Sequence, residues 1–373
     1  MNSKDFTEIP IFVLSTYGHN GIDWLHSLLD GSEELLIMPA FSFFRTLNAI
    51  GINKNDSNQK IVDSLIKNFR FNPTYLVRRR KFLYSEDDFN NFSKNLHLYL
   101  DTTNEKNFIK KLFYGIHFTF ALIKKIDLKY IKAIIVQEHV PFYITNYHTI
   151  FNSSFIMMMR DPRAAIAGSI KSMSRVQPDK KINAHDFNYI ILYWLFAREQ
   201  IRKIRLDNNK VKFMQNEKMH INLEFEMKKL CDWLGIRFTK NNLFQTILKE
   251  PWSGESAYLP VNSEMDLLND VPINYYKQEE VNKRWRSQID KNVINMIEVI
   301  CGFEMKKFNY NCDNKKNFFN NIYGYFKYFT VFRKIRTQHD SLYWRLLQII
   351  KERIVRVMTI FSPKLTHYFF KRL

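Results

Sequence analysis

Short apolar runs alternate along the chain with stretches of amphipathic, helical spacing. The runs are candidates for buried strands and lie at Ile9–Ser15, Leu35–Met38, Ala133–Val136, Phe155–Met159 and Val211–Met214. Continuous apolar runs are typical of parallel strands, because helices cover both faces of such a sheet. Helical spacing follows the first and fourth runs, over Ile22–Leu29 and Ala164–Met173. The pattern predicts an α/β fold in which helices flank a central parallel sheet of about five strands.

Two regions depart from this alternation. Residues 45–130 are polar and mostly helical in spacing, and we expect them to form a helical insertion beside a cleft. The basic cluster at 78–81 within this insertion either contacts a ligand or forms a solvated face. Residues 314–373 contain 13 Lys and Arg, two acidic residues and 14 aromatic residues. Helical spacing at 342–361 indicates a basic amphipathic helix, which either lies on an anionic membrane surface or packs on the domain. The chain therefore divides into an α/β domain at 1–313 and a basic, aromatic, helical C-terminal extension.

Charge and cysteine content narrow the class of protein. The chain has 56 Lys and Arg against 37 Asp and Glu, a net charge of +19. Such a surface favours an anionic partner, which is a phosphate-rich cofactor, an acidic glycan, nucleic acid or a membrane face. Three cysteines exclude a disulfide-stapled scaffold and fit a reducing compartment. No run reaches the ~20 apolar residues of a spanning helix, and no secretory signal is visible, so we expect a cytoplasmic protein, with peripheral membrane contact left open.

A glycine-containing turn follows the first predicted strand. Gly18 and Gly21 allow a tight turn and a close approach of the backbone to a ligand. The next helix directs its first N–H groups and its positive dipole end at this turn, which suits phosphate, sulfate or phosphosulfate. The sheet is therefore expected to be P-loop-like. The Walker A pattern and its lysine are absent, however, which argues against a kinase of a small molecule.

Polar groups follow two more strands, where the ends of parallel strands share a ligand-binding edge. Arg160 follows the fourth run and can bind a phosphate through two hydrogen bonds. The alternative is a structural salt bridge within its Arg-Asp pair. Glu138 and His139 follow the third run, and His139 stands where a general base is needed. No metal-ligand spacing such as C-x-x-C is found, so no metal site is expected.

Taken together, these segments resemble sulfotransferases that use 3′-phosphoadenosine 5′-phosphosulfate. The family's loop, T-Y-P-[KR]-S-G-T-T-W-L, is similar to TYGHNGIDWL at 16–25. Its K-T-H-x-P or E-K-x-P segment is similar to QEHVP at 137–141, and its R-[DN]-P-[RK] motif to the segment 160–169. Weaker similarity at 211–238 and 282–310 extends the resemblance over roughly 9–310. The continuation of the loop resembles bacterial and carbohydrate branches of the family.

The resemblance implies a site and a reaction. The cofactor-binding loop would comprise Tyr17, Gly18, His19, Asn20, Gly21, Ile22, Asp23 and Trp24, with Trp24 stacking on adenine. Arg160 and Ser169 would hold the 3′-phosphate, and Arg284 would lie near the cofactor or the acceptor. His139 would be the base, with Glu138 as the alternative. The expected reaction moves a sulfuryl group to a hydroxyl of a carbohydrate or glycolipid and releases 3′,5′-adenosine bisphosphate, with the insertion on the acceptor side.

Several positions depart from the family pattern. His19 replaces the Lys or Arg that stabilises the leaving group, and it can do so when protonated or as an N–H donor. Asp23 replaces a threonine and either repels the phosphosulfate, caps the helix or orients His19. The helix serine is Gly168, with Ser169 one position later. A catalytically inactive relative and a basic membrane-binding or nucleic-acid-binding module therefore stay open as alternatives, although nucleic acid is not the partner that we expect.

Overall fold

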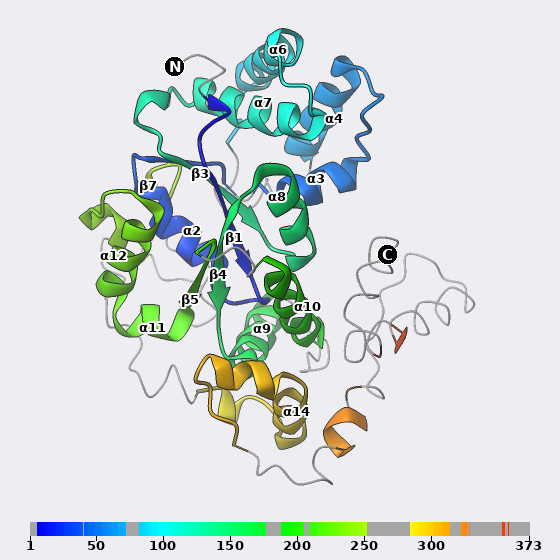
Figure 1. Cartoon of the computed structure of the whole chain (residues 1–373), viewed down its shortest axis with the longest axis vertical. Coiled ribbons are helices and arrows are strands. Elements are labelled where there is room, and N and C mark those ends of the chain that lie inside the picture. The colour runs from blue at the N-terminus through cyan, green and yellow to red at the C-terminus, as the bar shows by residue number, and fades with distance from the viewer. Residues whose placement is uncertain are drawn as a thin grey trace.

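The computed structural model describes residues 6–39, 41–71, 82–176, 188–204, 209–251, 284–313, 322–326, 328, 353–354 and 357. Its centre is a five-stranded sheet in the order β2-β3-β1-β4-β5, in which all neighbours are parallel (Figure 1). The strands are β1 (Ile11–Thr16), β2 (Leu35–Ile37), β3 (Ala133–Glu138), β4 (Ser154–Met159) and β5 (Val211–Gln215). The α/β class and the parallel sheet predicted from the apolar runs are confirmed.

Alternate residues of the central strands enter two separate cores. Val13 of β1 packs into the larger core, whereas Leu14 packs into the smaller one. The smaller core is covered by α2 (Ile22–Asp30) and α12 (Leu223–Leu234), with α11 (Asn216–Ile221) between β5 and α12. The opposite face is covered by α8 (Ile144–Phe151), α9 (Pro162–Val176), α10 (Asn188–Ile204) and α14 (Lys291–Lys307). Burial on both faces explains why the strands are continuously apolar.

Helices fill the chain between β2 and β3, at one end of the molecule (Figure 1). They are α3 (Phe43–Ile50), α4 (Asn58–Phe71), α6 (Glu86–Thr102), α7 (Phe108–Ile123) and the 3₁₀ turn η1 (Leu128–Tyr130). Ser85 and Asp88 form a reciprocal capping box at the start of α6, which satisfies backbone N–H groups of its first turn. The basic cluster at 78–81 lies outside the described residues.

Short elements complete the domain. They are η2 (Pro141–Tyr143), η4 (Lys240–Leu243), β6 (Thr246–Ile247), β7 (Glu250–Pro251) and η5 (Arg284–Ser287). Within the C-terminal extension, residues 322–326 are helical and Tyr328 is buried in the larger core. The amphipathic helix expected at 342–361 lies outside the described residues, apart from isolated positions. No helix in the described ranges combines the length and the hydropathy needed to cross a bilayer.

Candidate active site

The loop between β1 and α2 has an unusual backbone. The angle φ is positive at Gly18 (100°), His19 (46°) and Gly21 (83°), a region that residues with a Cβ adopt reluctantly. The Gly18 N–H donates to the Thr16 hydroxyl oxygen at 3.1 Å, and no side chain caps α2 at Gly21. A loop that turns in this way before a helix directs backbone N–H groups outward, which favours an anionic ligand.

Contacts with neighbouring strands fix the loop. The Asn20 side-chain amide donates to the Met158 carbonyl of β4 at 3.0 Å. At Gly21, an added Cβ would lie 2.4 Å from Nδ2 of Asn216, the first residue of α11. Glycine at this position is therefore required both by the backbone angle and by the space available. The loop has its shape before any ligand binds, which lowers the entropy lost on binding.

Burial divides the loop residues into two groups. The side chains of Tyr17, Asn20 and Ile22 are buried, so these residues can offer only backbone groups to a ligand. The Trp24 ring is partly exposed and stacks on His220, with ring centroids 4.2 Å apart and an interplanar angle of 11°. The imidazole covers one face of the indole, and the ring also packs against the smaller core.

Arg160 directly follows β4. Its guanidinium lies against α9 at Gly168, where an added Cβ would come within 3.2 Å of Nη1. Glycine at 168 therefore leaves room for the guanidinium. The Arg160 charge acts on both His19 and Glu217, which places it near the loop and near α11. Within the described ranges, no carboxylate forms an ion pair with Arg160, so its charge is available to a ligand.

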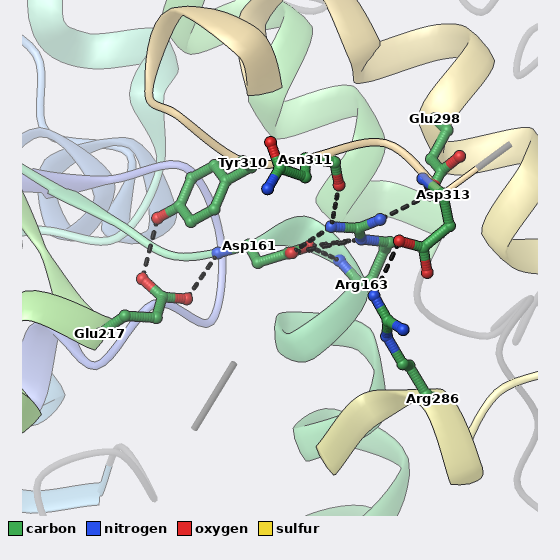
Figure 2. A network of polar contacts seen from close by, with 8 residues as sticks. All are labelled: Asp161, Arg163, Glu217, Arg286, Glu298, Tyr310, Asn311 and Asp313. Atoms are coloured by element: carbon green, nitrogen blue, oxygen red, sulfur yellow. Dashed lines mark hydrogen bonds and ion pairs between the residues drawn. The ribbon is translucent and has the colours of Figure 1, made fainter. Parts of the chain in front are cut away.

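The Arg-Asp pair of this motif is structural, but its arginine is Arg163 and not Arg160. Figure 2 shows the buried Arg163 guanidinium donating to Asp161 at 2.6 Å, to Glu298 of α14 at 2.5 Å and to the Asn311 carbonyl at 2.7 Å. The same group lies 4.1 Å from the centre of the Trp285 ring. This network joins the turn after β4 to α14 and to the segment that follows it.

Glu217 holds the same turn from the other side. One of its carboxylate oxygens accepts the Asp161 backbone N–H at 2.9 Å, and the other accepts the Tyr310 hydroxyl at 2.8 Å (Figure 2). Burial raises the pKa of Glu217, while the hydrogen bond from the Asp161 backbone and the Arg160 charge oppose the rise. The backbone beside Arg160 is thus fixed by side chains from α11 and from the chain after α14.

Residues at the end of β3 point to opposite faces of the sheet. The buried Gln137 amide donates to the Asp23 carboxylate in the first turn of α2, at 2.7 Å, and His139 Nε2 lies 3.7 Å from the same oxygen. Glu138 is 0% exposed and acts on Tyr147 in the larger core, whereas the His139 side chain is 29% exposed. Burial raises the pKa of Glu138 to about 8, so its carboxyl is largely protonated at pH 7. Geometry therefore favours His139 over Glu138 as the base.

His19 lies where the loop and the two strand ends meet. Desolvation by the surrounding groups is the main cause that lowers the pKa of His19 to about 4, although the residue is exposed and water reaches its side chain. The charge of His139 and then that of Arg160 lower it further, and Asp23 opposes them. The imidazole is therefore neutral at pH 7 and can act as an N–H donor without carrying a positive charge.

Two further residues that the sequence predicted for the site, Ser169 and Arg284, offer no described side-chain group to a ligand. The Ser169 hydroxyl is buried and donates to the Ala165 carbonyl of its own helix at 2.8 Å, so its proton is already used. Arg284 begins η5, but its side chain lies outside the described part of the structure. In the described ranges, no group of three or more His, Cys, Asp or Glu side chains is placed to hold a metal ion.

Two residues at the site were missed by reasoning from the sequence. Gln137 was taken only as part of a matched segment, and Glu217 only as part of a weaker similarity. A polar residue at the end of an apolar strand is a signal for Gln137, because burial of an amide requires a specific partner. Glu217 lies in α11, beyond the end of β5, and gives no such signal. Their partners, Asp23 and Tyr310, are far away in the sequence and could not be assigned from spacing.

Comparisons with known proteins give a distant likeness. No protein-family model matches the chain, and no curated protein matches its sequence. Among solved structures, the sulfotransferase domain from the curacin biosynthetic pathway is 14% identical with a TM-score of 0.48, over 81% of this chain and 98% of that one. The sulfotransferase domain of the Synechococcus PCC 7002 olefin synthase is 14% identical with a TM-score of 0.43, over 81% and 94%. A sulfotransferase from Mycobacterium avium is 13% identical with a TM-score of 0.37, over 83% and 79%.

Proposed function

We propose that the chain is a sulfotransferase that moves a sulfuryl group from 3′-phosphoadenosine 5′-phosphosulfate to a hydroxyl of a carbohydrate or glycolipid. One observation carries the proposal: the glycine-containing loop, Arg160, which has no ion-pair partner among the described residues, and the pair of His139 with Asp23 converge at one edge of the sheet. The charges of His139, Asp23 and Arg160 all act on the pKa of His19, which supports their lying close together. A nucleotide with an anionic group at each end and an acceptor hydroxyl could both reach this edge.

The donor nucleotide fits the groups available. Backbone N–H groups of residues 18–22 would hold the 5′-phosphosulfate at the positive end of α2. The Arg160 guanidinium, which has no described carboxylate partner, would bind the 3′-phosphate through two charge-assisted hydrogen bonds. The partly exposed Trp24 ring would stack on adenine, a contact worth about 1–3 kcal/mol. Ser169 contributes little, because its hydroxyl proton is bound within α9.

The transfer needs positioning, proton removal and charge stabilisation more than covalent participation of the protein. The acceptor oxygen bonds to sulfur while the bond from sulfur to the bridging oxygen breaks, and 3′,5′-adenosine bisphosphate keeps that electron pair. His139 takes the acceptor proton, because it is exposed at the site whereas Glu138 is buried in the other core. Backbone N–H groups of the loop and the neutral His19 stabilise the charge on the departing nucleotide.

The positive charge of the chain supports the proposed class of acceptor. A net charge of +19, concentrated in residues 314–373, suits a glycan or glycolipid at an anionic surface. This composition supports an enzyme that works in the cytoplasm and rests on the inner membrane face through the C-terminal extension.

The proposal is tested by incubating the protein with donor labelled in its sulfuryl group and with soluble-glycan or membrane-glycolipid extracts. We expect label in one of them. His139→Ala should lower the rate by about 10²–10⁴-fold while 3′,5′-adenosine bisphosphate still binds. Glu138→Gln is the matched control and should keep the rate, because its carboxyl is buried and protonated. Failure of the wild-type chain to label any extract and to bind the nucleotide would exclude the proposal.

A further inference from the structure

A carboxylate stands at an unexpected place in the loop and helix that would bind an anionic donor. Asp23 is in the first turn of α2, and a negative charge there repels a phosphosulfate. The positive end of a helix tolerates such a charge, but it does not determine where the side chain points. Its direction is set by Gln137, which is 1% exposed and donates to Asp23 Oδ1 at 2.7 Å.

The Gln137 amide orients Asp23 but itself carries no charge. The same carboxylate oxygen lies 3.7 Å from His139 Nε2, which is an ion-pair distance. Contacts between a base and the group that orients it are often long without substrate and shorten in the reactive complex. The titratable groups described around His139 are Asp23 from α2 and His19 from the loop, with Arg160 acting on His19 and Glu138 on the opposite face of β3.

We infer that Asp23, held by Gln137, is a positioning residue that orients His139 and compensates its charge after proton transfer. This inference rests on the proposed function. Before transfer, the Asp23 carboxylate lies beside the imidazole that is to accept the proton. After His139 takes the acceptor proton, imidazolium and carboxylate form a neutral pair, and the proton later leaves to water. The interaction is therefore stronger at the transition state than in the ground state, so it raises kcat without lowering KM for the donor.

The test compares the wild-type chain with Asp23→Asn, which keeps the shape and removes the charge. We expect kcat to fall about 10–100-fold, while KM for the donor stays the same or falls because repulsion is removed. The acidic limb of the pH profile should move to lower pH, because a base without its carboxylate has a lower pKa. Asp23→Thr is a second variant with the same expected result, should Asp23→Asn fold poorly. Gln137→Met keeps the carboxylate but frees it to move, and should lower kcat by less than Asp23→Asn.

A second measurement does not depend on turnover. In the free protein, the imidazole signal of His139, assigned by its loss in His139→Ala, is titrated by NMR. We expect a midpoint about one pH unit lower in Asp23→Asn than in the wild-type chain. If the wild-type chain transfers sulfuryl groups and Asp23→Asn changes neither this midpoint nor the pH profile, the inference is wrong. If the wild-type chain neither transfers nor binds nucleotide, the proposed function fails, and the midpoint alone then decides whether the pair exists.

Discussion

Replacing Arg163 by methionine is expected to be among the most damaging single changes in the chain. The Arg163 side chain is 3% exposed, and it joins Asp161, Glu298 and the Asn311 carbonyl, so two buried carboxylates and one backbone carbonyl depend on it (Figure 2). Methionine keeps an apolar stem beside Trp285 but offers no hydrogen bonds. Asp161 and Glu298 would then be carboxylates of 8% and 3% exposure without their cation.

The size of the effect follows from this burial. Removing one partner of a buried ion pair costs about 3–5 kcal/mol, because the other charge is left uncompensated. The exposed pairs of this chain are a different case, since water and salt screen them. At about 2.1 cal/mol/K of unfolding entropy per residue, a loss of 3 kcal/mol corresponds to a fall in the melting temperature of about 4 °C. The network thus contributes mainly to the integrity of the turn that carries Arg160.

Urea denaturation followed by tryptophan fluorescence measures the loss. Lys228→Met is the matched control, because Lys228 and Glu224 form an ion pair at 2.6 Å in which both side chains are 52% exposed, and it should leave the midpoint unchanged. Adding Glu298→Gln to Arg163→Met should restore part of the stability, since it removes one uncompensated charge. A loss below about 1 kcal/mol in Arg163→Met would refute the reasoning.

Two further substitutions separate stability from binding and from protonation. Gly168→Ala should stabilise α9 by up to about 1 kcal/mol, yet weaken nucleotide binding because its Cβ would crowd Arg160; thermal denaturation and calorimetry should therefore change in opposite senses. The pKa of Glu138 is about 8 in the folded protein, against an ordinary value of 4.5, so between these two pH values the folded protein keeps a proton that the unfolded chain has released. Stability linked to Glu138 is fully present below pH 4.5 and falls as the pH rises to 8, so Glu138→Gln should gain a stability advantage over that window; an advantage that does not grow with pH would contradict this.

The strands could be predicted because burial on both faces leaves a continuous apolar run, as at Phe155–Met159. Their ends could not. The third run was expected to stop at Val136, but β3 continues through Gln137 and Glu138, because both pair with β1. A hydrophobic pattern does not detect the last residues of a strand when their side chains are polar. At β3 these residues lie at the candidate site.

The sequence placed His139, Arg160 and the glycine loop at one edge, because parallel strands end there. It could not show that Asp23 turns toward Gln137 and His139, since this depends on the rotation of α2 against the sheet. It also could not show that Arg163, and not Arg160, forms the structural salt bridge: its second carboxylate partner is 135 residues away. Contacts at such separations arise from packing, which residue spacing does not encode.

Calorimetric titration with 3′,5′-adenosine bisphosphate tests most directly whether the loop and Arg160 hold opposite ends of one nucleotide. The wild-type chain should bind, and Arg160→Met should bind at least about 10-fold more weakly, since charge-assisted hydrogen bonds contribute ~1.5–3 kcal/mol. Arg202→Met, at an arginine that is 66% exposed on α10, should bind like the wild-type chain. Equal affinity in the wild-type chain and Arg160→Met, or no binding by the wild-type chain, would contradict the account.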